Sequence, residues 1–216
     1  MENNTNLEYI FKSVNTKDIY LLNKYLTSIM EVKDNTKIWL ESKEVNIPIW
    51  SSDYPNKDVF KEDLETSLNT IGMFTSGDNK LVGYVTYYDA KSHYNEEYKN
   101  ELINDISKRN NDIDPYPFKK LDNFKDTNVI VIFRLMVDPK YNSKGLGKML
   151  MNKVKEEVIN LNMTITSNDN KYSYLGLLCH PSNYIAKKMY LRLGYKYLET
   201  INFIYGPYEI YVYSLN

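Results

Sequence analysis

Two glycines, Gly145 and Gly147, stand in the segment "YNSKGLGKML" (141–150), where an apolar run gives way to a helical pattern. Unpaired backbone N–H groups converge at a helix N-terminus and attract anions such as a pyrophosphate. Glycine lets a ligand approach the backbone closely because it has no Cβ. Lys144 and Lys148 add positive charge. The segment therefore predicts an anion-binding turn, and a turn that merely starts a helix is the alternative.

Two common phosphate-binding motifs do not fit this segment. A Walker A loop would need glycine at Asn142 and serine or threonine at Met149. A dinucleotide fingerprint would need a third glycine or alanine at Leu150. The glycine turn has to be interpreted from the elements around it.

Hydrophobic periodicity divides the chain into the elements that must position this turn. In chain order we expect a strand at 7–14, helices at 16–30 and 56–70, a hairpin at 70–90, a strand at 128–139, a helix at 145–162, a strand at 172–180, a helix at 183–194 and two strands within 195–216. Residues 31–55 are ambiguous, and we expect a short helix followed by a loop. The order is β-α-α-β-β-(insert)-β-α-β-α-β-β, an α/β (α+β) fold.

The polar segment 91–127 interrupts this pattern between two expected strands. We expect a helix at about 95–109 and then a proline-rich loop. Connections of this length are often functional, so a lid or specificity element is one interpretation. A surface decoration or an oligomer contact is the other.

Composition excludes several classes of protein. The chain has 27 Lys and Arg against 28 Asp and Glu, a formal charge of −1, so no global positive field favours nucleic acid. The single cysteine, Cys179, cannot form an internal disulfide, which suits a reducing cytoplasm. The start "MENNTNLEYI" lacks the features of a signal peptide, and no apolar run is long enough to span a membrane. We expect one cytoplasmic domain over 1–216, with an insertion at 91–127.

Two segments in register carry a family resemblance. "LMVDPKYNSKGLGKMLM" (135–151) resembles the acetyl-CoA motif of the GCN5-related N-acetyltransferase (GNAT) family, in which a strand ending Val-x-Pro leads into a basic, glycine-containing loop. "NYIAKKMYLRLGY" (183–195) is similar to a second motif, Asn-x-x-Ala-x-x-x-Tyr followed by Gly-aromatic. The resemblance covers about residues 7–215 and implies a mixed, mostly antiparallel central sheet flanked by helices.

The resemblance also implies where acetyl-CoA would bind. The pantetheine arm would pair with the backbone of Leu135, Met136 and Val137, and an N–H near Met136 would stabilise the oxyanion. The pyrophosphate would lie on the amides of Asn142, Ser143, Lys144, Gly145, Leu146, Gly147 and Lys148. Asn142 departs from the family, which usually has Gln or Arg there.

The second motif implies two further roles. Asn183 would contact the pantetheine arm, and a helix N-cap is the alternative reading. Tyr190 would protonate the leaving CoA thiolate, and a core tyrosine is the alternative.

The general base has no obvious candidate, because the central strand offers Arg134 where many relatives place a glutamate. Arg134 would either bind an acidic acceptor group or pair with a surface carboxylate. His180, at the end of the strand 172–180, is the preferred base, and a structural histidine is the alternative. His93, Glu96 and Glu97 rank lower, as solvated residues of the insertion. We interpret Cys179 as a buried strand residue, because this family transfers the acyl group directly.

The resemblance implies an N-acetyltransferase that moves an acetyl group from acetyl-CoA, its co-substrate, to an amine of a small molecule, peptide or protein. It implies no metal, no nucleic acid and no membrane, and a homodimer is possible. A non-catalytic acyl-CoA-binding sensor or scaffold on the same fold is the alternative. An unrelated α/β phosphate binder is the third hypothesis, which the two motifs in register disfavour.

Overall fold

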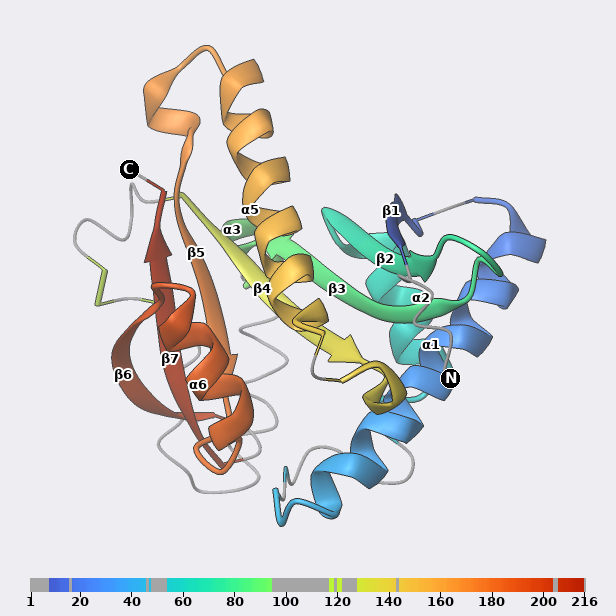
Figure 1. Cartoon of the computed structure of the whole chain (residues 1–216). Helices are drawn as coiled ribbons and strands as arrows, with labels where there is room; N and C mark the ends of the chain where they lie inside the picture. The colour runs from blue at the N-terminus through green and yellow to red at the C-terminus, as the bar shows by residue number, and fades with distance from the viewer. Residues whose placement is uncertain are drawn as a thin grey trace.

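A seven-stranded sheet organises the protein in the computed structural model, in the order β1-β2-β3-β4-β5-β7-β6 (Figure 1). Neighbouring strands run antiparallel except β4 and β5, which are parallel. The structure describes residues 8–15, 17–45, 47, 54–94, 117–118, 120–121, 128–142, 144–203 and 206–215.

The elements follow the predicted order. The strands are β1 (Tyr9–Ser13), β2 (Asn69–Thr75), β3 (Leu81–Asp89), β4 (Asn128–Val137), β5 (Tyr172–Cys179), β6 (Lys196–Phe203) and β7 (Gly206–Ser214). The helices are α1 (Ile19–Glu41), α2 (Lys57–Thr66), α3 (Ala90–His93), α5 (Leu146–Thr164) and α6 (Tyr184–Arg192), with short 3-10 turns η1 (Pro139–Tyr141) and η2 (Asn168–Asn170). The expected fold class and element order are confirmed. Within the described residues, no helix is both long and apolar enough to cross a membrane.

Helix α1 is the main departure from the sequence prediction. We expected a helix at 16–30 and then a short helix and a loop, but one helix continues to Glu41. Its second half keeps a buried stripe through Val32, Thr36 and Leu40. Asp18 caps the helix, with its carboxylate accepting hydrogen bonds from two backbone N–H groups of the first turn.

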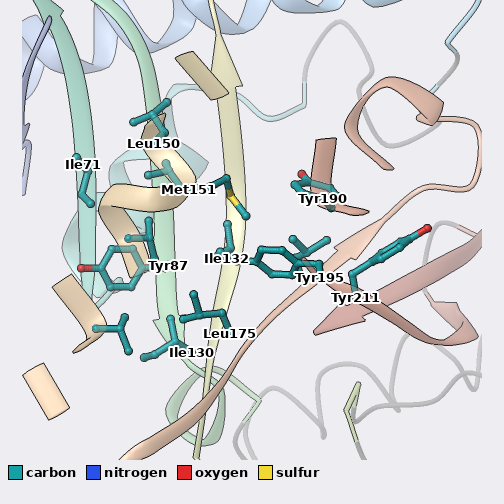
Figure 2. Packing of buried hydrophobic residues seen from close by; sticks show 14 of the residues in the cluster. Ile71, Tyr87, Ile130, Ile132, Leu150, Met151, Leu175, Tyr190, Tyr195 and Tyr211 are labelled. Atoms are coloured by element: carbon teal, nitrogen blue, oxygen red, sulfur yellow. The ribbon is translucent and has the colours of Figure 1, made fainter. Parts of the chain in front are cut away.

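Helices cover both faces of the sheet. Helix α5 packs on one face, where Leu150, Met151 and Val154 meet the sheet in a buried cluster that also includes Tyr190 of α6 (Figure 2). Helices α1 and α2 pack on the opposite face through a second cluster. Each of these two clusters is therefore covered by its own helices.

The sheet opens between its parallel strands. Strand β4 pairs with β5 from Asn128 to Ile132, where Ile132 faces Leu177. Beyond that point, the described part of β4 pairs with β3 and the described part of β5 with β7. Figure 1 shows the two strands diverging toward their carboxyl ends. This divergence leaves one edge of the second half of β4 without a neighbouring strand among the described residues.

The end of the insertion belongs to the core. Phe118 and Leu121 are buried in a third apolar cluster with residues of β4, β6 and β7. The helix expected at about 95–109 and most of the proline-rich loop lie outside the described residues.

Candidate functional site

The glycine turn forms the N-terminus of α5. Gly145 caps the helix in the left-handed conformation, with φ 72°, and supplies no side-chain hydrogen bond to it. The first N–H groups of α5 consequently have no helical partner. A Cβ on Gly145 would meet open space, so backbone conformation is what requires glycine there. A Cβ on Gly147 would lie 3.0 Å from Sδ of Met189 in α6, so this glycine permits close helix packing. Close approach of a ligand was the reason expected from sequence for both.

The hydrogen-bond register of β4 determines which amides face the opening. The N–H of Asp138 donates to the carbonyl oxygen of Val82 at 2.8 Å, so this pair is hydrogen-bonded across β3 and β4. Alternation then directs the amide of Met136 toward β3 and the amides of Leu135 and Val137 toward the opening. The carbonyl of Val137 agrees, because it accepts a hydrogen bond from Oγ1 of Thr36 at 3.1 Å. The N–H groups near Met136 that face the opening are therefore those of its two neighbours, Leu135 and Val137.

A cavity of about 820 Å³ lies at this opening. Among the residues singled out from sequence, it brings together Leu135, Met136, Val137, Asn142, Gly145, Leu146, Gly147, Lys148, Asn183 and Tyr190. Lys144 is exposed and does not line the cavity. Ser143 lies outside the described residues. His180 is not among the lining residues either.

One wall of the cavity was not anticipated. Thr36, Trp39 and Leu40 of α1 line it. These residues belong to the segment 31–55, which is ambiguous in sequence, so they carried no signal of a site. The continuation of α1 brings them there.

The charged side chains that line the cavity are all cationic. Lys148 of α5 and Lys188 and Arg192 of α6 contribute, and none forms an ion pair with the described residues. No described lining residue is Asp, Glu or His. The cavity therefore favours an anionic ligand.

Two asparagines present amide groups to the cavity. Nδ2 of Asn142 is buried and has no hydrogen-bond partner among the described residues, although a buried donor is normally paired. Oδ1 of Asn183 accepts a hydrogen bond from the N–H of Ala186 at 3.1 Å, which makes Asn183 the N-cap of α6. This capping bond leaves the NH₂ group of Asn183 available as a donor.

Tyr190 lines the cavity and is largely buried. It is 8% exposed, and its ring packs near those of Tyr195 and Tyr211 (Figure 2). Burial, together with Cys179 and Tyr195, raises the pKa of the Tyr190 phenol well above its ordinary value. The phenol is therefore protonated at neutral pH, as an exposed tyrosine also is, and it is a weaker acid than an exposed tyrosine.

Cys179 is the last residue of strand β5, and His180 follows it. Nδ1 of His180 is 2.7 Å from Oγ of Ser182, and burial lowers the pKa of the imidazole, so the ring is neutral at pH 7. Cys179 is buried, and burial, aided by Glu209, raises the pKa of its thiol to about 12. That thiol is a poor nucleophile, as its interpretation as a strand residue anticipated.

Two expectations about charged residues need correction. Arg134 forms an ion pair with Asp63 of α2, and both side chains are 8% exposed, so its partner is buried rather than at the surface. His93 is half-buried, with its ring centroid 4.3 Å from that of Tyr88, and is not solvated. Burial lowers the pKa of His93 to about 4. Glu96 and Glu97 lie outside the described residues.

A sheet that opens between parallel strands, with a helix N-terminus and a cationic cavity at the opening, suits a ligand that carries phosphate groups. The sequence profile of the acetyltransferase (GNAT) family matches residues 36–195, and the chain belongs to this family. The resemblance of the two motifs is thereby confirmed. No curated protein sequence matches the chain significantly.

Several solved structures share the fold at low sequence identity. Arabidopsis thaliana NAA60 in complex with acetyl-CoA is similar with a TM-score of 0.57 and 17% identity, over 97% of this chain and 99% of that one. A GNAT-family acetyltransferase from Streptococcus agalactiae is similar with a TM-score of 0.61 and 14% sequence identity, over 97% of this chain and 98% of that one. The PaiA N-acetyltransferase from Thermoplasma acidophilum in complex with coenzyme A has a TM-score of 0.57 and 14% sequence identity, over 96% of this chain and 100% of that one. At these identities the likeness establishes the fold.

Proposed function

We propose that this protein is an acetyl-CoA-dependent N-acetyltransferase that moves the acetyl group directly to an amine of a small molecule or a peptide. The observation that carries the proposal is the cavity itself. It combines the open edge of β4, the N-terminus of α5 and the Asn183 and Tyr190 side chains of α6.

The phosphates of acetyl-CoA would be held at the glycine turn. The N–H groups at the start of α5 supply donors, and Lys148, Lys188 and Arg192 supply charge. The unpartnered Nδ2 of Asn142 fits the same ligand, because a phosphate oxygen would satisfy it. Asparagine therefore replaces the longer family side chain as a donor close to the turn.

The thioester would lie along β4. The N–H groups of Leu135 and Val137 face the opening, and either one in contact with the thioester oxygen would stabilise the negative charge that develops there. The amine nitrogen forms the new bond to the carbonyl carbon as the carbon–sulfur bond breaks. The hydroxyl of Tyr190, which lines the cavity, then protonates the departing thiolate.

His180 is the proposed acceptor of the amine proton. Its neutral ring can take a proton, and its Nε2 has no hydrogen-bond partner among the described residues. Because His180 does not line the cavity, the proton would reach it through a water molecule.

A non-catalytic acyl-CoA-binding module is the second candidate function. One observation favours it: no described residue lining the cavity is a carboxylate or a histidine. A binding module needs donors for the carrier and no proton acceptor beside the thioester, so this lining suits it.

The first experiment is to follow thermal unfolding with acetyl-CoA, CoA and ATP, and then to assay CoA release across a panel of amines and peptides. A ligand at about 100 times its Kd stabilises the folded state by roughly 2.7 kcal/mol. Stabilisation by both CoA species but not ATP, with amine-dependent CoA release, supports the transferase. Stabilisation without turnover on any acceptor supports the binding module. No stabilisation by either CoA species overturns both.

A further inference from the structure

A buried polar cluster lies on the face of the sheet that α1 and α2 cover. Asp63 of α2 pairs with Nε of Arg134 in β4, and the hydroxyl of Tyr88 in β3 donates to the other carboxylate oxygen of Asp63 at 2.8 Å. Asp63 is 5% exposed and Arg134 is 9% exposed. The cluster thus joins a helix to two adjacent strands through charged side chains.

Aromatic rings exclude water from this ion pair. The guanidinium carbon of Arg134 is 4.7 Å from the ring centroid of Phe133, 5.5 Å from that of Phe60 and 5.8 Å from that of Tyr54. His93 contacts Tyr88 in a tilted arrangement and Phe133 edge to face, and the rings of Tyr88 and Phe133 also contact each other. A buried ion pair is weak support for stability, since apolar residues of similar size often serve as well. Its position is therefore more informative than its strength.

The ion pair lies directly after an irregularity in β4. The β3–β4 register shifts between Thr86 and Tyr87, where Thr86 faces Arg134 and Tyr87 faces Ile132. Phe133 is the extra residue of this bulge. A bulge changes which side of the strand each later side chain and amide faces. Before it, Ile132 packs toward α5, and after it, Met136 packs toward α1.

The bulge therefore determines which amides reach the cavity. With it, Arg134 and Met136 point their side chains to the α1 face, and the amides of Leu135 and Val137 face the opening. A slip of one residue would exchange these directions. The buried carboxylate of Asp63 binds the first residue after the bulge, and a slip of the strand would break this contact.

We propose that Asp63 and Arg134 are positioning residues that hold the β4 bulge and thereby aim the Leu135 and Val137 N–H groups at the thioester. Neither residue touches the substrate; both act through the backbone of β4. This inference rests on the proposed function, because it assigns the two residues a part in polarising the thioester. If the pair served only to attach α2 to the sheet, its loss would change stability and leave the bound thioester unaffected.

The test compares Asp63→Asn with two milder variants on adjacent residues of β3. Tyr88→Phe removes the hydrogen bond to Asp63. Tyr87→Phe, the matched control, removes a hydrogen bond of 2.8 Å to Glu157 of α5 on the other face. For each we would measure acetyl-CoA affinity, kcat with the best acceptor, and the infrared carbonyl band of bound acetyl-CoA carrying ¹³C at the acetyl carbonyl.

For Asp63→Asn we expect affinity within about threefold of wild type, kcat lowered by about tenfold or more, and a carbonyl band shifted toward its position in free solution. Tyr88→Phe should shift the band in the same direction by less, and Tyr87→Phe should not move it. A changed unfolding temperature with an unmoved band in Asp63→Asn overturns the proposal. If Asp63→Asn does not fold, Tyr88→Phe decides: an unmoved band in that variant overturns the proposal.

The infrared measurement needs acetyl-CoA but no acceptor. If wild type binds acetyl-CoA and never turns over, the transferase function fails, and a shifted band still supports positioning by Asp63. If wild type turns over and the band does not move in any variant, the positioning role fails by itself. If wild type does not bind acetyl-CoA, both fail.

Discussion

Tyr190 combines two properties that a sequence cannot separate, core packing and a chemically usable hydroxyl. The side chain is buried among aromatic rings, as an ordinary core tyrosine would be, and it also lines the cavity. Its hydroxyl has no hydrogen bond to the described residues, so its removal leaves no protein group unpaired. The two roles can therefore be tested apart.

We predict that Tyr190→Phe folds with stability close to wild type and binds acetyl-CoA, while kcat falls by roughly 10²-fold. The reason is that protonation of the leaving thiolate is lost, and general acids contribute on the order of 10²–10⁴ in rate. Steady-state kinetics of wild type and Tyr190→Phe with the same acceptor would measure the fall in kcat. A variant with full kcat would show that Tyr190 is only a packing residue.

We predict that the buried His93 lowers the free energy of unfolding in acid. Its folded pKa is about 4, below the ordinary value of 6.5, chiefly through burial, with opposing effects of Asp63 and Arg134. The unfolded chain therefore binds a proton at His93 more readily than the folded protein does. The free energy of unfolding is unaffected by this difference above pH 6.5, and it decreases as the pH falls from 6.5 toward 4. At pH 5 the loss is about 2 kcal/mol.

Urea unfolding of wild type and of His93→Phe at pH 7 and pH 5 would test this. Phenylalanine keeps the ring contacts and removes the titration, so the variant should lose about 2 kcal/mol less than wild type between the two pH values. Equal losses in the two proteins would contradict the assignment.

At the scale of elements, the N-terminus of α5 is the feature that the sequence predicted best. The glycine spacing, the preceding strand and the helical stripe all indicated the turn, and the structure places it at the cavity. The reason for each glycine was less accessible, because φ at Gly145 and the proximity of Met189 to Gly147 depend on tertiary structure.

Gly145 allows a matched pair of substitutions, Gly145→Asn and Gly145→Asp. Asparagine and aspartate both tolerate the left-handed conformation and have nearly the same shape, so they differ mainly in charge. We predict that Asn lowers CoA affinity modestly and that Asp lowers it by at least a further tenfold, since a carboxylate opposes the phosphates. Titration calorimetry would measure both, and equal affinities would argue against a phosphate at this turn.

Helix α1 shows why part of the site could not be predicted. Residues 33–37, "KDNTK", lie in the segment that was ambiguous in sequence, yet Lys33 and Thr36 are buried and the helix continues through them. Thr36 bonds to the end of β4, and the next turn brings Trp39 to the cavity. Burial of polar side chains by a distant strand leaves no periodic signal. The Asp63–Arg134 pair could not be predicted from sequence for the same reason, because its two residues are 71 positions apart in the chain.

At the scale of the whole molecule, β4 and β5 divide the sheet into two parts joined by a short parallel pairing. One part holds β1 to β4 and the other holds β5 to β7. A ligand along β4 would bridge the opening between them. The amides of Leu135 and Val137 face that opening, whereas the amide of Met136 is directed to β3.

This arrangement predicts an alternating pattern of hydrogen exchange. On addition of acetyl-CoA, exchange at Leu135 or Val137 should slow strongly, because a solvent-facing N–H gains a partner, while exchange at Met136 should change little. Residue-resolved exchange by NMR, with and without the ligand, would measure it. Equal slowing at all three residues would indicate general stabilisation instead of direct contact.

The parallel direction of β4 and β5 has a consequence for connectivity. Two parallel neighbours cannot be joined by a tight hairpin, so the chain must return along the sheet before β5 can begin. Helix α5 is that return path, and it has to start beside the end of β4. The same end of β4 is where β5 diverges, so the edge of β4 that has no neighbouring strand among the described residues lies beside the first turn of the helix. The family's chemistry thus draws on a junction that the path of the polypeptide already requires.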